Sequence, residues 1–148
     1  MAETEDSPVA RGLLPRLIGY QLRRAQVAMF RDFARRVTAA EDITPALFGM
    51  LQVIAANPGL AQSRLAEAMG VERSAIVKVV DQLEARDLIA RQPSPRDRRS
   101  HSLHLTAAGQ DRLARLEELV LAHEAEFAGR LSPEEQAQLL SLLDRLHD

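Results

Sequence analysis

The stretch of sequence that decides the fold covers residues 62–105 and reads QSRLAEAMGVERSAIVKVVDQLEARDLIARQPSPRDRRSHSLHL. Its first part has apolar residues at helical spacing and stops at Gly70, a residue type that readily adopts the left-handed conformation of a helix end. Its second part, from about residue 73 to residue 86, repeats apolar residues at i, i+3, i+4 and i+7, namely Ile76, Val79, Val80 and Leu83. Two short helices joined by a turn that contains glycine predict a helix-turn-helix.

A basic hairpin is expected after the second helix. Residues 88–91 read as a strand, residues 93–97 as a loop with two prolines, and residues 99–105 as a returning strand with Leu103 and Leu105 facing inward. Five arginines and two aspartates fall between Arg86 and Arg99, although the whole chain carries a net charge of −2. A basic edge on a mildly acidic protein suits contact with a phosphate backbone at that edge only.

Helical patterns flank this segment on both sides. One follows Pro15 and ends near Thr38. A second begins at the N-cap Thr44, followed by Pro45, and carries Leu47, Phe48, Leu51 and Ile54 at helical spacing. Another begins after Thr106, also a suitable N-cap. Ser132 and Pro133 start a last helix as its cap and first residue. This helix carries more leucines than the surface of a small monomer accommodates: Leu139, Leu140, Leu142, Leu143 and Leu146. A partner helix, from the same chain or from a second one, is needed to cover them.

The composition excludes several classes of protein. The absence of cysteine excludes disulfides, thiolate zinc sites and cysteine-based sensing. No apolar run reaches the roughly 18 residues of a membrane span, and the N-terminus is acidic, so we expect a cytoplasmic protein that does not contact a membrane. His101 and His104 fall on opposite faces of the expected strand and make a poor metal pair. Because no phosphate-binding loop, His-Glu-x-x-His motif or nucleophile elbow is present, we expect no enzyme, cofactor or metal site.

Four segments carry a resemblance to a known family: SAIVK at 74–78, LEARDLI at 83–89, DRR at 97–99 and LTAAG at 105–109. On these residues the chain resembles the MarR family of bacterial winged helix-turn-helix transcriptional regulators. The resemblance implies a mainly α fold with a small β-wing. It also implies a homodimer that binds a pseudo-palindromic site on double-stranded DNA, as a repressor released by a small effector.

The expected organisation follows from this resemblance. Residues 1–11 form a disordered tail, and residues 12–148 form a single domain. Within that domain, the DNA-binding winged helix covers about 44–106, and the dimerisation helices cover about 12–40 and 107–147. The chain departs from the family at Lys78, where arginine is usual, and at Asp87, where glycine is frequent.

The expected DNA contacts divide between the second helix and the wing. The helix residues that lie away from the apolar stripe are Arg73, Ser74, Val77 and Lys78. Arginine and lysine suit phosphates or guanine edges, serine suits a phosphate or base, and valine suits a thymine methyl group. In the wing, Arg98 is expected to enter the minor groove, Asp97 to orient it, and Arg96 and Arg99 to contact the DNA backbone. Outside such a motif, these side chains would simply face water.

The resemblance also implies an effector pocket where the dimerisation helices meet the head. By region, it would draw on Leu17, Tyr20, Gln21, Arg24, Phe48 and Leu51. The Tyr20 hydroxyl and the arginines of the first helix suit an aromatic anion or its coenzyme A thioester. The alternative is that Tyr20 is a packed helix residue and that the arginines face water or a partner's acidic C-terminal helix.

Two other functions, a protein–protein contact module and an enzyme, fit the sequence less well than a ligand-responsive DNA-binding regulator. A winged-helix module that mediates protein–protein contacts would predict an acidic or apolar wing, whereas this wing is basic. An enzyme would require a catalytic constellation, and the sequence offers none.

Overall fold

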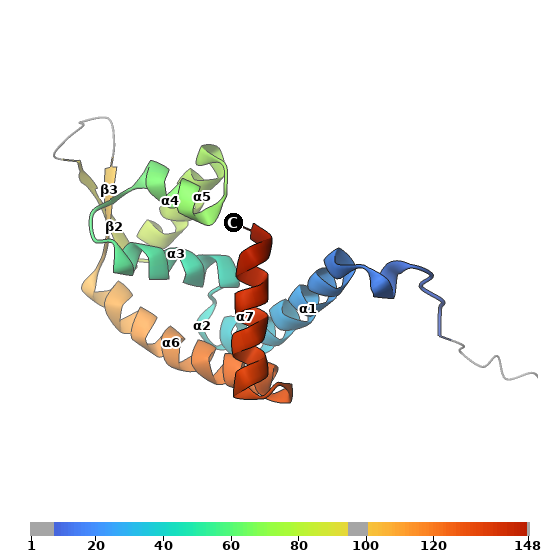
Figure 1. Cartoon of the computed structure of the whole chain (residues 1–148). Coiled ribbons are helices and arrows are strands. Elements are labelled where there is room, and N and C mark those ends of the chain that lie inside the picture. Colours follow the sequence, from blue (N-terminus) through green and yellow to red (C-terminus); the bar gives the residue numbers. More distant parts are fainter. Residues whose placement is uncertain (1–7, 95–100, 148) are drawn as a thin grey trace, which may run out of the picture.

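The computed structural model describes residues 8–94 and 101–147 of the chain. In chain order, its elements are η1 (Leu14–Arg16), α1 (Ile18–Phe33), η2 (Ala34–Thr38), α2 (Ala39–Glu41), α3 (Pro45–Ala56), β1 (Leu60–Ala61), α4 (Gln62–Met69), α5 (Arg73–Ala85), β2 (Ile89–Pro93), β3 (His101–Leu105), α6 (Ala107–Phe127), η3 (Ala128–Arg130) and α7 (Pro133–His147). The helices α3, α4 and α5 and the strands form a head, and the long helix α6 leads away from it to α7 (Figure 1). The mainly α fold with a small β-wing confirms the prediction from the sequence.

The first long helical course runs from α1 through η2 to α2. The segment η2 is a π-helical turn, in which the backbone N–H of Ala39 reaches back to the carbonyl of Ala34. Phe33 and Val37 are buried, whereas most of α1 is exposed. The course ends at Asp42, which has a φ of 53°. A helix over this region was predicted, and it extends three residues beyond the expected end.

The helix that precedes the helix-turn-helix begins at a side-chain cap. The Thr44 hydroxyl accepts a hydrogen bond from the Leu47 N–H at 3.3 Å and thereby caps α3.

The two helices of the helix-turn-helix have nearly the predicted bounds. Helix α4 ends at Gly70, whose φ of 64° lies in the left-handed region that glycine adopts without strain. Helix α5 begins three residues later and buries Ile76, Val80 and Leu83. Helix α5 therefore packs these three residues against the core and leaves its other face exposed.

The described strands form an antiparallel sheet in the order β1-β3-β2. Arg91 of β2 lies opposite Leu103 of β3, and Leu60 of β1 pairs with the same residue from the other side. The hairpin of β2 and β3 was predicted, but β1 was missed because a strand of two residues has no alternation to detect. Leu103 is completely buried, as expected.

Helix α6 is fastened to the head at its first turn. The Thr106 hydroxyl donates to the carbonyl of Asp87 at 2.5 Å and accepts from the Gly109 N–H at 2.9 Å. A Cβ on Gly109 would lie 1.9 Å from the carbonyl oxygen of Leu88, so only glycine fits there. The LTAAG segment of the sequence therefore joins the head to the long helix.

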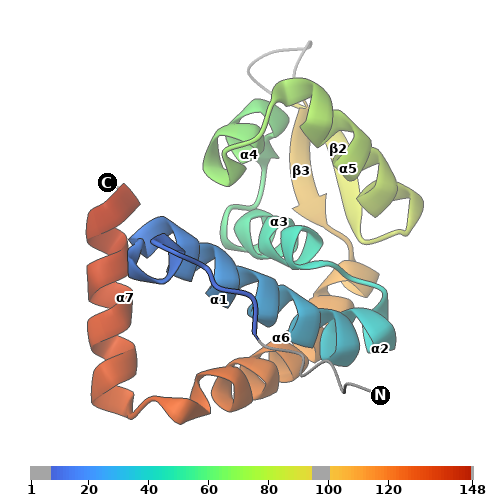
Figure 2. The same cartoon turned by 90° about the vertical axis from the view of Figure 1, so that its right-hand side faces the viewer.

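Helix α7 stands apart from the head (Figure 2). It begins with a capping box, because the Glu135 N–H donates to the Ser132 hydroxyl at 3.2 Å and the Ser132 N–H donates to the Glu135 carboxylate at 2.8 Å. None of its residues is buried by the described part of the chain. Leu140 and Leu146 are 64% and 60% exposed. The described chain alone therefore leaves much of this leucine-rich face uncovered.

Within the described residues, no helix is both long enough and apolar enough to span a bilayer.

Candidate nucleic-acid interface

Helix α5 exposes the four of its residues that the sequence assigned to DNA contact. Arg73, Ser74, Val77 and Lys78 are all exposed. Ser74 and Lys78 lie opposite the buried stripe, Val77 lies beside it, and Arg73 is exposed at the N-terminal end of α5. Val77 is 41% exposed although it is aliphatic. Arg73 and Ser74 occupy the first turn, where the helix dipole favours negative groups. This face can therefore offer cationic, hydroxyl and methyl contacts to one ligand.

The structure describes the two strands of the wing but not the residues that connect them. The strands β2 and β3 pair from Ile89 opposite Leu105 to Pro93 opposite His101. Arg96, Asp97, Arg98 and Arg99, the predicted wing contacts, lie outside the described residues. Their roles therefore remain predictions from the sequence.

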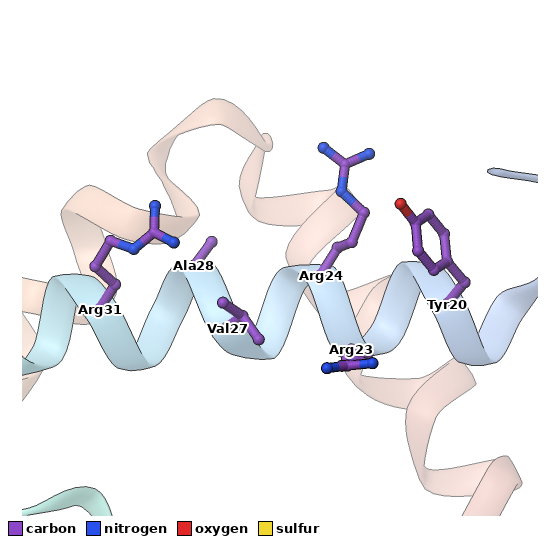
Figure 3. A pocket seen from close by; sticks show the side chains of 6 residues that line it. All are labelled: Tyr20, Arg23, Arg24, Val27, Ala28 and Arg31. Atoms are coloured by element: carbon purple, nitrogen blue, oxygen red, sulfur yellow. The ribbon is translucent and has the colours of Figure 1, made fainter. Parts of the chain in front are cut away.

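Part of the predicted effector site lies along α1 (Figure 3). A hollow of about 340 Å³ is lined by Tyr20, Arg23, Arg24, Val27, Ala28 and Arg31. The Arg24 guanidinium carbon lies 5.9 Å from the centre of the Tyr20 ring, within the range of a cation–π contact. The hollow thus combines an aromatic ring with three guanidinium groups.

The structure does not bring the other four predicted pocket residues into this hollow. Leu51 is completely buried in the core of the head, and Phe48 packs against that core. Helical periodicity placed them on an apolar face, and that face covers the core instead. Leu17 is 42% exposed, and the Gln21 side chain donates to the carbonyl of Pro15 at 2.8 Å. Tyr20 and Arg24 are therefore the predicted pair that the structure keeps together.

A charged cluster between α1 and α6 was missed by the sequence analysis. His123 is 2% exposed, and its Nδ1 lies 2.9 Å from Oδ2 of Asp32. The rings of Phe33 and Phe127 pack against its imidazole, with centroids 5.4 Å and 6.0 Å away. The one available signal was Asp32, the only acid among seven arginines between residues 11 and 36.

Arg36 extends this cluster to the surface. Its Nε lies 3.0 Å from Oδ2 of Asp32, and its terminal nitrogens lie 2.5 Å and 2.6 Å from the Glu126 carboxylate. The hydrogen bond from Arg36 holds the pKa of Asp32 below its ordinary value, and His123 lowers this pKa further, against the opposing effect of burial. The two carboxylates, Glu126 first, raise the pKa of Arg36. The ion pairs of Arg36 with Asp32 and with Glu126 join the helical course of α1 and η2 to α6.

The part of the chain that the structure describes contains no group of three or more His, Asp or Glu side chains arranged to hold a metal ion.

Comparison with known proteins identifies the family of this chain. The profile of the MarR family matches residues 41–100. A protein of Thauera aromatica, described as a transcriptional regulatory protein for the hcr operon, is 50% identical over 146 residues, which cover 99% of this chain and 88% of the relative.

Solved structures agree with that relationship. The transcriptional repressor CouR, bound to a 23-mer DNA duplex, is 40% identical with a TM-score of 0.91, covering 96% of this chain and 100% of CouR. CouR bound to p-coumaroyl-CoA is 38% identical with a TM-score of 0.85, covering 93% and 96%. The PcaV regulator of Streptomyces coelicolor, in complex with its natural ligand, is 30% identical with a TM-score of 0.83 over the same shares. From these relationships, the chain belongs to the MarR family and is a transcriptional regulator, not an enzyme.

Proposed function

We propose that the protein is a homodimeric repressor that binds double-stranded DNA through α5 and the β-wing, and that a small anionic effector releases it. The observation that carries the proposal is the outer face of α5, which exposes Arg73, Ser74, Val77 and Lys78 together and buries none of them. An exposed aliphatic side chain between two cations suits a groove that offers both phosphates and thymine methyl groups. The similarity to CouR, which has been solved on a DNA duplex, supports this use of the helix.

Two winged heads in one dimer would bind successive major grooves of a pseudo-palindromic site. In this arrangement, residues 12–148 act as one domain, with the head at about 44–106 and the dimerisation helices on either side. Lys78 can make a single-point contact only, because an ammonium group lacks the planar fork of arginine.

The second copy of the chain is proposed to cover α7 and the exposed side of α1. A groove lined by apolar side chains, among them Leu22, Met29, Phe127, Leu139 and Leu143, runs between α1, α6 and α7. Seven arginines lie between residues 11 and 36, and eight acids lie from residue 117 to the end. This charge distribution favours packing of the basic first helix of one chain beside the acidic last helices of the other.

The effector is proposed to be an aromatic acid or its coenzyme A thioester. The hollow on α1 offers the Tyr20 hydroxyl for a hydrogen bond and the guanidinium groups of Arg23, Arg24 and Arg31 for carboxylate or phosphate groups. CouR, 38% identical to this chain, has been solved with p-coumaroyl-CoA, which combines a phenolic acid with a coenzyme A group. Both observations favour an anion that also has an aromatic ring.

DNA binding is tested by fluorescence anisotropy with a labelled duplex from the region flanking the gene, at several salt concentrations, against an unrelated duplex. We expect Lys78→Ala to weaken binding to both duplexes, and to reduce the salt slope by about one if Lys78 contacts a phosphate. Val77→Ala should reduce the preference for the flanking duplex. Asp111→Asn, on the exposed surface of α6 and outside the acidic segment proposed for dimerisation, is the control. Equal affinity for both duplexes, unaffected by the α5 variants, would refute DNA recognition by this helix.

Effector binding is tested by calorimetry with benzoate, salicylate, a hydroxycinnamate and p-coumaroyl-CoA. Tyr20→Phe and Arg24→Ala should weaken whichever ligand binds, whereas Arg64→Ala on α4 should not. If none of the four ligands gives heat or shifts the melting temperature, the aromatic-anion proposal is wrong.

A further inference from the structure

The edge strand of the wing is joined to α5 by a carboxylate. Because the described strands follow the order β1-β3-β2, strand β2 pairs with one neighbour only among them. The backbone N–H of Arg91 in this strand donates to Oε2 of Glu84 at 3.0 Å. Backbone donors at a sheet edge otherwise need water or another chain. A side chain of α5 therefore satisfies part of the edge of the wing.

The side chain of Arg91 makes a second connection to the same helix. Its guanidinium forms an ion pair with the carboxylate of Asp81, and its Nε lies 3.8 Å from Oε1 of Glu84. The Arg91 side chain is 20% exposed, whereas those of Asp81 and Glu84 are 58% and 44% exposed. One largely covered arginine thus lies against two carboxylates that are three residues apart on α5.

These carboxylates lie next to the surface proposed for DNA contact. Asp81 follows Lys78 by three residues and Val77 by four, so all three share one side of α5. An unpaired carboxylate at this place would repel phosphates. It would also leave the wing and the helix without their charged connection. Arg91 itself is held against α5 by these two carboxylates.

We propose that Arg91 is a positioning residue of the DNA-binding surface, which acts through Asp81 and Glu84. Arg91 fixes the wing against α5, and its guanidinium offsets the negative charge of the Asp81 and Glu84 carboxylates next to the DNA. The proposal rests on DNA binding by α5, which wild-type binding to the flanking duplex tests separately.

The test is a mutant cycle on full-length protein, measured by anisotropy with the flanking duplex at several salt concentrations. It compares Arg91→Gln, the pair Asp81→Asn with Glu84→Gln, and the combination of all three changes. Arg73→Gln, alone and in the background of the same pair, is the control for a direct phosphate contact. Thermal unfolding of each variant shows whether the fold is retained.

We expect Arg91→Gln to weaken binding by about 10-fold, within the range of roughly 2- to 150-fold that couplings between contacting residues span. Once the two carboxylates are changed, Arg91→Gln should cause little further loss, because Arg91 no longer has partners on α5, and the salt slope should stay as in the wild type. Arg73→Gln should reduce the slope by about one and lose the same affinity in both backgrounds.

An equal loss in both backgrounds with a smaller salt slope would show that Arg91 contacts a phosphate directly, and would overturn the proposal. Unchanged affinity of Arg91→Gln would overturn it as well. If Arg91→Gln fails to fold, the same cycle is run with Arg91→Met, which keeps the length of the side chain. A wild-type protein that does not bind the duplex would contradict the proposed function instead.

Discussion

His123 of α6 and Asp32 of α1 lie 91 positions apart in the sequence, and their side chains meet at 2.9 Å between Nδ1 and Oδ2. An ionised carboxylate only accepts hydrogen bonds, so the imidazole donates. Since His123 is buried between two phenylalanine rings, this bond fixes the crossing of the two long helices. The crossing lies immediately before the π-helical turn η2, which continues α1 into α2.

Asp32→Asn should lower the free energy of unfolding at neutral pH, with an effect that depends on pH. The folded-state pKa of Asp32 lies below its unfolded value of about 3.9, because Arg36 and His123 favour the ionised form. Its contribution is therefore present above pH 4 and is lost as the pH falls through the folded-state pKa. Urea unfolding at pH 7, 5, 4 and 3, at one protein concentration, measures the difference from wild type. A difference that stays constant down to pH 3 would contradict this account, and Asp111→Asn, exposed at the start of α6, is the control.

Gly109→Ala should destabilise the protein by about 3 kcal/mol, the upper end of ordinary overpacking, because the new Cβ would overlap the backbone carbonyl of Leu88. The rigid backbone at the start of α6 gives the methyl group no place to move. Gly129→Ala is the matched control, since beyond its own helix backbone and chain neighbours no described atom lies within 4 Å of the position of its Cβ. Thermal unfolding compares the two variants. Similar melting temperatures of Gly109→Ala and Gly129→Ala would show that the contact of Gly109 with the Leu88 carbonyl does not affect stability.

Asp87→Gly should stabilise the protein by up to about 1 kcal/mol. Asp87 has a φ of 57°, a conformation that costs an L-residue energy and glycine none, although glycine loses more entropy on folding. Asp87→Ala should have the opposite effect, because alanine tolerates this region less well than aspartate. Denaturant unfolding of both variants tests the sign. A loss of stability in Asp87→Gly would mean that the aspartate side chain matters more than its backbone conformation.

Leu140→Glu should raise the dissociation constant of the dimer by about 30-fold, which corresponds to the roughly 2 kcal/mol at which a side chain counts as a hot spot of an interface. Leu140 is 64% exposed in the single chain. Ser141→Glu adds the same charge to the next position of α7, which turns away from the leucines. Light scattering over a dilution series gives the oligomeric state of each variant. A dimer that survives Leu140→Glu and dissociates with Ser141→Glu would place the interface on the other face.

The sequence predicted the helices well because their ends carry local signals. Thr44, Gly70, Thr106 and Ser132 mark helix ends in the sequence and in the structure. The exposed face of α5 followed from the same periodicity that identified its buried face. Local signals of this kind depend on residues a few positions apart.

What the sequence missed depends on contacts between distant segments. The pairing of Asp32 with His123 and the two-residue strand β1 have no local pattern. Phe48 and Leu51 lie on an apolar face of α3, but periodicity alone does not say whether a core or a pocket covers that face. The connection of Arg91 to Asp81 likewise appears only once β2 is placed beside α5.

The central claim, that α5 contacts DNA, is tested most directly by a single introduced thiol, because the chain has no cysteine of its own. Val77→Cys places the thiol on the outer face of α5, and Ser141→Cys places it on the outer face of α7. The rate of alkylation is measured for each variant with and without the flanking duplex. We predict that the duplex slows alkylation of Val77→Cys at least about tenfold, in line with the burial of a groove-facing side chain, and leaves Ser141→Cys unchanged. Equal rates for Val77→Cys with and without saturating duplex would contradict the account.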